Sequence, residues 1–455
     1  MKRSLFEITL ACGGRVVNCE NDIYVDKIVN NDKECVDNCL YVSLRGERFD
    51  GDSFVSNAVK RGASAVLTSG SGFDGVPCVI VPDTESALGM IAGYYRKKEL
   101  SRVIAVTGSA GKTTVKEMIA AVLSVRGEPL KTDGNKNNLI GLPLTLLSCD
   151  GQRTAVVEAG ISLPGEMENL SRIAAPDLAV ITSVGHMHAQ TLGGIEGIAR
   201  EKSKIALHLQ QNGAVIVQSV DLDKLSLGER RVYTVGQDDP SADFNVTNRV
   251  SLENESVFDL HIKWKRSFIG LKVPMLGRVA CVDGAFAAAV GVINGLNENE
   301  VRLGLMRYKS VGQRQNILYK NGLTVFSDCY NSGPEAATEA LYTFNELVRV
   351  RGGGKRVILL GSMLELGQCS QSLHVSLGKT VAELGADALV TYGELAKNIA
   401  LGAMIGGLDP DRVFSYTEDE EAEVTKLIER ECNDGFLFIK GSRAMRMERF
   451  IPFSR

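Results

Sequence analysis

A short run rich in glycine and hydroxyl residues has the composition of a phosphate-binding loop. Residues 107–114 read Thr-Gly-Ser-Ala-Gly-Lys-Thr-Thr, between an apolar run at 103–106 and a helical pattern that extends to Ser124. Glycines let backbone N–H groups turn toward phosphate oxygens, and the following helix N-terminus adds positive charge. Lys112 would contact the β- and γ-phosphates of a nucleotide, and the Thr113 hydroxyl would bind magnesium. The residues expected to bind the nucleotide are Gly108, Ser109, Ala110, Gly111, Lys112, Thr113 and Thr114.

The spacing of this loop differs from the common P-loop pattern of glycine, four residues, glycine, lysine and serine or threonine. Val106 occupies the place of the first glycine, so the pattern here is the shorter Thr-Gly-x-x-Gly-Lys-Thr. The alternative interpretation is a plain glycine-rich turn with a solvated lysine. The strand pattern before the loop and the helix pattern after it favour the phosphate site.

Polar side chains follow two further strand patterns, 155–158 and 178–182. Glu158 ends the first, and His188 follows the second. Ligands gather at the carboxyl ends of the strands in open α/β sheets, where a carboxylate could complete a magnesium site with Thr113. Taken alone, His188 is more simply a structural residue, and Lys202 in the next helical pattern is a solvated lysine.

The phosphate loop and several longer motifs resemble the Mur ligase family of ATP-dependent enzymes, which build the peptide of the peptidoglycan precursor. Residues 132–145 fit that family's T-x-G-N-x-N-N-x-x-G-x-P-x-T segment, and 327–334 resemble its D-D-x-Y-N-A-N-P turn. Residues 361–367 with His374, and the Lys-Gly-Ser-Arg run 440–443, are similar to two further motifs. The resemblance covers nearly the whole chain.

The resemblance implies a set of site residues that spacing alone does not give. It implies ATP and magnesium, with two ions, as cofactors, and a carbamate on Lys202 that makes this lysine an anionic ligand. The implied metal ligands are Thr113, Glu158, His188 and Lys202. The C-terminal residues implied to close over ATP are Arg314, Asp328, Tyr330 and Asn331. The polar residues implied to bind the substrate are Asn135, Asn137, Asn138 and Thr145. The implied catalytic residues are Lys112, Glu158, His188, Lys202 and Arg314.

The function that the resemblance implies is ATP-dependent amide ligation. An acyl phosphate on UDP-N-acetylmuramoyl-tripeptide would react with D-alanyl-D-alanine, releasing ADP and phosphate. A sister ligase with another amine acceptor, a non-catalytic relative that binds nucleotide or precursor, and a P-loop kinase or nucleoside triphosphatase remain alternatives. The sequence identifies neither the third residue of the tripeptide nor the general base for the amine.

Three stretches bear on substrate contacts. Residues 40–51 resemble an N-terminal stretch of the family, but 31–33 read Asn-Asp-Lys where relatives carry Asp-Ser-Arg. A lysine there lacks the two-pronged phosphate contact of arginine. Residues 279–280 read Val-Ala, and Asp283 follows, where relatives place His-Asn and a later asparagine beside the adenine. The sequence therefore does not identify the residues that contact UDP or the adenine of ATP.

The helix and strand patterns that carry these residues form three α/β groups along the chain. The expected domains are a small N-terminal α/β domain (1–99), a central P-loop-type domain (100–311) and a C-terminal Rossmann-like doubly wound domain (312–455). The central domain is expected to have a mainly parallel sheet with a small antiparallel insert at 244–274. In the third domain, the sequence predicts strands that alternate with helices. The strands are 324–328, 357–360, 388–391 and 436–440, and the helices are 334–349 and 374–384.

Composition excludes several other classes of protein. With 455 residues, 51 basic against 55 acidic side chains and a net charge of -4, the chain lacks the basic excess of a nucleic-acid-binding protein. No apolar run is long enough for a membrane span and no leader is visible, so a cytoplasmic location is expected. The ten cysteines form no CxxC pair and are expected to be reduced thiols. We expect a monomer that binds small-molecule substrates.

Overall fold

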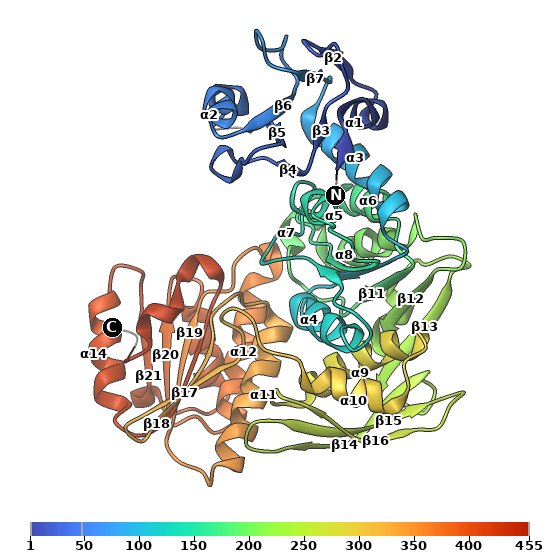
Figure 1. The fold of residues 1–455 in the computed structure, drawn as a ribbon. Helices are drawn as coiled ribbons and strands as arrows, with labels where there is room; N and C mark the ends of the chain where they lie inside the picture. The colour runs from blue at the N-terminus through green and yellow to red at the C-terminus, as the bar shows by residue number, and fades with distance from the viewer. Residues whose placement is uncertain (1, 47–48, 454–455) are drawn as a thin grey trace.

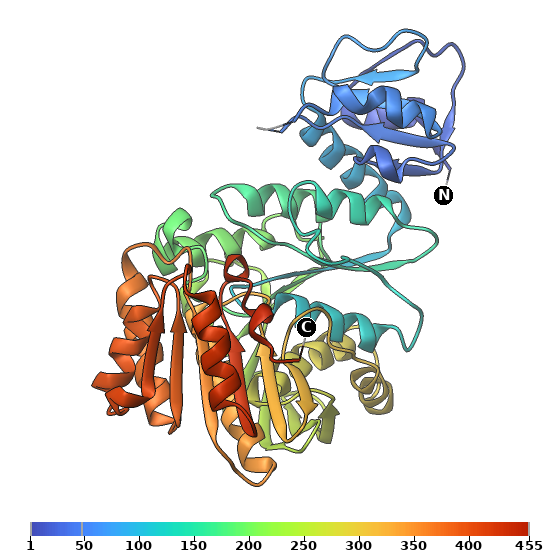
Figure 2. The ribbon, with the colours of Figure 1, turned by 90° about the vertical axis from the view of Figure 1, so that its left-hand side faces the viewer.

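The computed structural model describes residues 2–46 and 49–453, which form three α/β units in chain order (Figure 1). The N-terminal unit sits above the central unit, and the C-terminal unit lies beside the central unit, as the rotated view in Figure 2 also shows. The α/β class predicted from sequence is confirmed. The limits at 99/100 and 311/312 stay predictions, and Glu47 and Arg48 of the N-terminal stretch lie outside the described residues.

The N-terminal unit is a five-stranded sheet in the order β2-β7-β6-β5-β4, in which only β2 runs antiparallel to its neighbour. A two-stranded β1-β3 pair lies beside it. Its helices and strands are β1 (Arg3–Ser4), α1 (Leu5–Cys12), β2 (Arg15–Val17), β3 (Tyr24–Val25), β4 (Lys27–Val29), β5 (Cys39–Val42), α2 (Val55–Lys60), β6 (Ala63–Thr68), β7 (Cys78–Ile80) and α3 (Thr84–Glu99).

Helix α3 joins this unit to the next. The side chain of Asp83 accepts a hydrogen bond from the Ser86 N–H and so caps the helix N-terminus. Near the other end the buried Arg96 donates to the carbonyls of Ala174 and Ala175. These bonds attach α3 to the C-terminal end of α6 (Glu166–Ala174) in the central unit. They use the basic end of α3 that the sequence pattern places at the boundary.

The central unit is a nine-stranded sheet in the order β16-β15-β14-β13-β12-β11-β8-β10-β9. From β9 along the sheet to β14, including β8, each strand is parallel to the next. The pairs β14–β15 and β15–β16 are antiparallel. Its elements are β8 (Arg102–Thr107), α4 (Lys112–Leu123), β9 (Leu130–Lys131), α5 (Gly141–Leu147), β10 (Thr154–Glu158), α6 (Glu166–Ala174), β11 (Leu178–Ile181), α7 (Ala189–Leu192), α8 (Gly194–Ser203), β12 (Ala214–Gln218), β13 (Arg231–Gln237), β14 (Phe244–Ser251), β15 (Ser256–Ile262), β16 (Phe268–Val273), α9 (Arg278–Ile293) and α10 (Glu298–Met306).

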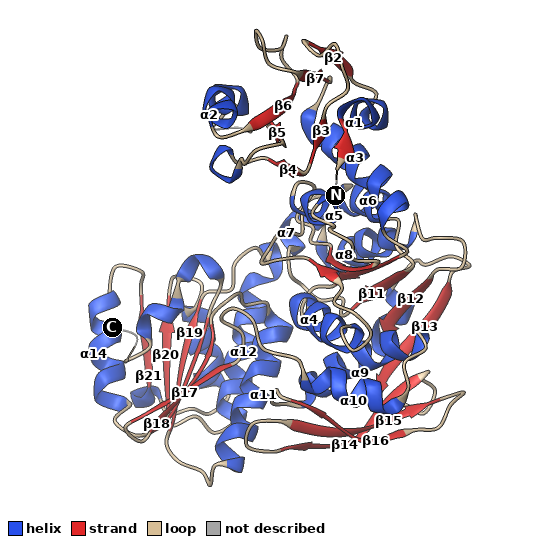
Figure 3. Cartoon of the chain, in the orientation of Figure 1, coloured by secondary structure: helices blue, strands red, loops and turns tan. Residues whose placement is uncertain are grey.

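Helices cover both faces of this sheet, because alternate side chains of each buried strand point to opposite faces. In β8, Val103 and Ala105 belong to the core with α5, α6 and α8. Their neighbours Ile104 and Val106 belong to the core with α4, α9 and α10. Figure 3 shows the strands between these helix layers. The continuous apolar run 103–106 is thus explained by burial on both sides.

The antiparallel insert predicted at 244–274 is present, as strands that are continuous with the central sheet. They do not form a separate body: β14 pairs in parallel with β13 and extends the central sheet, and β15 and β16 then add to its edge. The alternating pattern of these strands identified their antiparallel pairing correctly. It does not specify the parallel pairing of β14 with β13, which precedes it closely in the sequence.

The C-terminal unit is a six-stranded sheet in the order β17-β18-β22-β19-β20-β21, parallel except for β17. The doubly wound pattern is confirmed, with more elements than predicted: β17, α13, β21 and α14 were missed. Its elements are β17 (Asn316–Lys320), β18 (Leu323–Asp328), α11 (Pro334–Val350), β19 (Arg356–Gly361), α12 (Ser370–Glu383), β20 (Ala388–Tyr392), α13 (Lys397–Ile405), β21 (Val413–Tyr416), α14 (Glu421–Glu431) and β22 (Gly435–Lys440).

All ten cysteines are free thiols, as predicted. In the parts of the chain that the structure describes, no helix has both the length and the apolar character needed to cross a membrane.

Candidate active site

The phosphate loop runs from the end of β8 to the start of α4, as the sequence predicts. Gly108 and Gly111 both have positive φ angles, +152° and +78°. A Cβ atom at Gly108 would lie 1.9 Å from the Thr182 hydroxyl oxygen, so only glycine fits there. The first N–H groups of α4 have no partner within the helix and supply the positive N-terminus that the predicted phosphate site requires.

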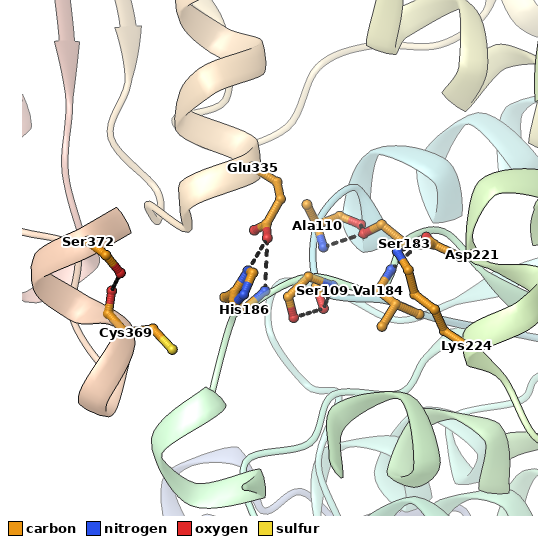
Figure 4. Close-up of polar contacts among 11 residues, drawn as sticks. Ser109, Ala110, Ser183, Val184, His186, Asp221, Lys224, Glu335, Cys369 and Ser372 are labelled. Carbon is orange, nitrogen blue, oxygen red and sulfur yellow. Dashed lines mark hydrogen bonds and ion pairs between the residues drawn. The ribbon is translucent and has the colours of Figure 1, made fainter. Parts of the chain in front are cut away.

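The loop is held by the segment that follows β11 (Figure 4). Ser109 N donates to the Ser183 carbonyl at 2.9 Å, and Ala110 N donates to the Ser183 hydroxyl at 2.9 Å. The Ser109 hydroxyl accepts from Gly185 N at 2.8 Å and donates to the Gly185 carbonyl at 2.9 Å. Two loop N–H groups expected to face phosphate are therefore used to fix the shape of the loop. No sequence motif identifies Ser183 as a partner of the loop.

Lys112 folds back over the loop that precedes it. Its ammonium donates to the Gly108 carbonyl at 2.8 Å. Burial lowers the pKa of Lys112, the negative charge of Glu158 opposes that change, and the positive charge of Arg314 adds to it. The ammonium therefore lies among groups from two units of the chain. A phosphate bound at the N-terminus of α4 would neutralise part of this positive charge.

Glu158 and Thr113 meet as predicted. The Thr113 hydroxyl donates to Glu158 Oε2 at 2.8 Å, and the Asn137 side-chain amide donates to Glu158 Oε1 at 2.8 Å. The Glu158 backbone N–H donates to the Thr132 hydroxyl at 2.9 Å. Glu158 is only 2% exposed. The carboxylate is thus fixed at the carboxyl end of β10 by two polar side chains.

The donor set at this carboxylate fits a magnesium ion. Magnesium prefers oxygen ligands, and a carboxylate beside a threonine hydroxyl at the phosphate loop provides them. The described residues hold no cluster of three or more His, Cys, Asp or Glu side chains that could bind a metal by itself. Any ion here would therefore also need the hydroxyl and nucleotide oxygens, as the prediction has it.

Arg314 reaches this centre from outside the central sheet. Its guanidinium donates to the Thr113 hydroxyl at 3.1 Å and lies over the Tyr330 ring, 3.6 Å from the ring centre. Asp328 accepts a hydrogen bond from Gln315 N at 3.3 Å and forms an ion pair with Lys440. Lys440 also donates to the Asn331 carbonyl at 2.9 Å. The predicted C-terminal residues therefore gather at one turn, and Arg314 connects that turn to the phosphate loop.

His188 is the N-cap of α7 and Lys202 lies on α8, and the positive charge of Lys112 acts on both side chains. Burial lowers the pKa of His188, and the positive charges of Lys112 and Lys202 lower it further, although Glu365 opposes them. Burial also lowers the pKa of Lys202 well below its usual range, and the charge of Lys112 adds to this effect. Lys202 is only 3% exposed, and its amine makes no hydrogen bond or ion pair with another described residue.

The four predicted substrate residues have different surroundings. Only Asn137 contacts Glu158. The Asn138 side chain accepts from the Gly141 N–H at 2.8 Å, at the N-terminus of α5. The Thr145 hydroxyl donates to the Gly141 carbonyl within that helix, and Asn135 contributes a backbone carbonyl to Asn137 N. In this structure Asn138 and Thr145 shape the segment, and the substrate role of all four stays a prediction.

Asp283 is a second buried carboxyl at the phosphate loop. It lies on α9 and is 5% exposed. A Cβ atom at Gly111 would lie 3.3 Å from Asp283 Oδ1. The sequence signalled this residue only through its departure from the family's asparagine. Burial raises the pKa of this carboxyl well above its usual range.

Replacing Asp283 with asparagine is expected to increase stability at neutral pH. The native carboxyl keeps a proton that the unfolded chain loses above about pH 4. Wild-type stability therefore falls as the pH rises from there toward the native pKa, by up to about 1.4 kcal/mol per pH unit. In thermal unfolding, the Tm difference between D283N and wild type should widen as the pH rises from about 4 toward the native pKa of Asp283. The exposed Asp74→Asn change should leave the curve parallel to wild type, and a constant D283N difference would contradict a protonated carboxyl.

Two comparisons of sequence agree with this geometry. Residues 106–291 match the Mur ligase middle domain, and residues 313–443 match the Mur ligase glutamate ligase domain. The UDP-N-acetylmuramoyl-tripeptide–D-alanyl-D-alanine ligase of Bacillus subtilis (strain 168) is 33% identical over 464 residues, covering 99% of this chain and 98% of that protein.

Solved structures give the same result over the whole fold. MurF from Acinetobacter baumannii has a TM-score of 0.86 at 27% identity, and the match covers 99% of this chain and 98% of that one. The MurF ligase from Thermotoga maritima in complex with ADP has a TM-score of 0.80 at 27% identity, covering 93% and 96%. The chain therefore belongs to the Mur ligase family and, within it, to the MurF-type ligases.

Proposed function

We propose that this chain is an ATP-dependent ligase that joins D-alanyl-D-alanine to UDP-N-acetylmuramoyl-tripeptide in peptidoglycan synthesis. The tripeptide carboxylate attacks the γ-phosphorus of ATP, the bond to the bridging oxygen breaks, and ADP leaves. The amine of D-alanyl-D-alanine then attacks the resulting acyl phosphate and displaces phosphate. Activation is needed because a free carboxylate has no leaving group that an amine can displace.

The observation that carries this proposal is the contact chain from Arg314 through Thr113 to Glu158 beside Lys112. Phosphoryl transfer depends mainly on positioning and on neutralising charge at the transferred group. Lys112 lies at the helix N-terminus to contact the β- and γ-phosphates. Arg314 comes from the chain segment before β17, so it can add its charge as the units close on ATP.

Magnesium would be held by Thr113 and Glu158, with a second ion at His188 and Lys202. When bound, magnesium neutralises charge on the phosphate oxygens. The lowered pKa of Lys202 supports a carbamate, because an unprotonated amine can bond to the carbon of CO2 and release a proton. The carbamate oxygens would be anionic ligands, which a protonated lysine could not provide.

The proposal assigns a part of the reaction to each unit. Residues 1–99 would bind the UDP end of the precursor, 100–311 would bind ATP, and 312–455 would close over ATP and bind the dipeptide. Asp328, Tyr330 and Asn331 would contact the nucleotide, and Asn135, Asn137, Asn138 and Thr145 the precursor. The enzyme would act as a monomer in the cytoplasm, where ATP is supplied.

The test is ADP release by the purified protein with ATP and magnesium. UDP-N-acetylmuramoyl-tripeptide and D-alanyl-D-alanine are supplied separately and together, and we expect sustained release only with both. Release with a single amino acid in place of the dipeptide would indicate a sister ligase. Release without any amine would indicate a nucleoside triphosphatase. ATP binding without release under any condition would indicate a non-catalytic relative.

A further inference from the structure

Two histidine–carboxylate contacts join the central unit to the C-terminal unit. Both histidines belong to the loop that follows β11. His186 Nδ1 lies 2.6 Å from Glu335 Oε1, a pair that Figure 4 shows, and His188 Nδ1 lies 2.6 Å from Glu365 Oε2. Glu335 is in the first turn of α11, and Glu365 is in the loop after β19. Both contacts join an imidazole Nδ1 to a glutamate carboxylate oxygen over the same distance, but their surroundings differ.

The Glu365 contact is made by backbone as well as side chain. The Glu365 carbonyl accepts a hydrogen bond at 3.2 Å from the N–H of Gln190, which lies in α7, the helix whose N-cap is His188. Its neighbour Leu364 donates from its N–H to the Ser442 hydroxyl at 2.9 Å. His188 and Glu365 have φ angles of +63° and +65°, which residues other than glycine rarely adopt. Such conformations persist only where the surrounding contacts enforce them.

The contact with Glu365 decides which ring nitrogen of His188 is available. Nδ1 is used by the carboxylate, while Nε2 has no hydrogen-bond partner among the described residues. His188 follows Gly185 by three residues, and Gly185 exchanges hydrogen bonds with Ser109 of the phosphate loop, so the histidine lies on the segment that holds this loop. A histidine that binds a metal through one nitrogen commonly donates its other N–H to a carboxylate, which fixes the tautomer and the ring orientation.

We propose that Glu365 is a positioning residue for His188: its carboxylate accepts a hydrogen bond from the Nδ1–H and so directs Nε2 to a divalent cation beside ATP. This inference rests on the metal role of His188 in the proposed function. Because Glu365 belongs to the C-terminal unit, the ring is oriented only while that unit is docked on the central unit. Docking of the two units and completion of the metal site are thereby linked through one side chain.

The Glu335 contact provides a matched control. Glu335 Oε1 also accepts from the His186 backbone N–H at 3.1 Å, so it fixes the loop but acts on a histidine without a metal role. The probe is Mn²⁺, titrated by electron paramagnetic resonance into full-length protein saturated with a non-hydrolysable ATP analogue. E365A should weaken Mn²⁺ binding by about 10- to 100-fold, and E335A should change it by less than about twofold.

Two further measurements separate positioning from loss of structure. E365Q keeps an oxygen acceptor for Nδ1 and should recover most of the affinity that E365A loses, even if E365A folds poorly. Electron spin echo modulation from the imidazole ¹⁴N should accompany Mn²⁺ in wild type and E335A and weaken in E365A. In an H188A background, the E365A change should have no additional effect on Mn²⁺ affinity.

The outcomes distinguish this inference from the proposed function. Equal losses in E365A and E335A, or an E365A loss that persists in the H188A background, would overturn the positioning role of Glu365 alone. An H188A variant with wild-type Mn²⁺ affinity would overturn the metal role of His188 and the positioning role with it. Ligation itself is tested separately, by ADP release with both substrates.

Discussion

Replacing Lys112 with methionine is expected to lower kcat for ADP release by about 1,000-fold, the loss typical of removing one group that stabilises transition-state charge. The Lys112 ammonium is the cation at the phosphate loop whose partner is a backbone carbonyl, that of Gly108, at 2.8 Å. Because no carboxylate in the described part of the chain forms an ion pair with this ammonium, its positive charge is available to the phosphates of ATP. Methionine keeps the length of the side chain and removes the charge. Steady-state ADP release with both substrates measures the loss.

The K112M variant should still fold, and its Tm should not fall. Lys272 offers a control in the same unit: it pairs with Glu255 at 2.7 Å and is half-exposed, so K272M should leave kcat within about twofold of wild type. A K112M enzyme with near-wild-type kcat and a raised KM for ATP would show that Lys112 contributes only to ground-state binding.

The phosphate loop and Glu158 could be predicted because their signals are local. A strand, a glycine loop and a helix follow one another within about 20 residues, and Glu158 ends a strand whose apolar run is visible in the sequence. The parallel order of β8 and β10 then places Glu158 beside Val106 in the register, next to the loop. Chain order and the right-handed connections of parallel strands are enough for that step.

The groups that hold the loop could not be predicted in this way. Ser183 and Thr182 contact Ser109 and Ala110 over more than 70 residues of sequence, and a serine or threonine after a strand has many equally plausible partners. The contact of Glu365 with His188 also depends on how two units dock. Such contacts depend on tertiary packing, and the local hydrophobic periodicity of one sequence does not indicate them.

The missed helix α13 shows how packing overrides propensity. Gly402 lowers the intrinsic helix propensity of this segment. In the structure a Cβ at Gly402 would lie 2.1 Å from the Val375 carbonyl oxygen, and one at Gly378 of α12 would lie 2.0 Å from the Ile399 carbonyl oxygen. The two helices approach so closely that glycine is needed on both, so the residue that weakens the local signal makes the helix pair possible.

The missed strand β17 had a signal in the sequence. Asn321 and Gly322 lie between β17 and β18, and both have positive φ angles, +53° and +85°. An Asn-Gly pair between two apolar runs is the strongest short-range indication of a two-residue hairpin. This strand matters for function because Arg314, two residues before it, reaches Thr113.

Replacing Lys202 with methionine is expected to abolish ligation and yet stabilise the fold. The buried amine has no partner among the described residues, and a polar group buried in that way costs about 1–3 kcal/mol, which an apolar side chain of similar length avoids. Loss of the anionic ligand that a carbamate provides should lower kcat by about 1,000-fold, equivalent to several kcal/mol of lost charge stabilisation. Thermal unfolding in CO2-depleted buffer and ADP release with both substrates measure the two effects.

The pH dependence of that stabilisation identifies its cause. Burial lowers the pKa of Lys202 well below its usual range, so between the native pKa and about 10.4 the unfolded chain binds one more proton than the native protein. Wild-type stability must then rise with pH across this window, and the advantage of K202M must shrink. Lys204, whose amine pairs with Glu201 at 2.6 Å, is the control: K204M loses an ion pair and should be slightly less stable than wild type with kcat nearly unchanged. If K202M were less stable than wild type at every pH, the Lys202 amine would be stabilised in the native state. The native protein would then lack the unpartnered amine that carbamate formation requires.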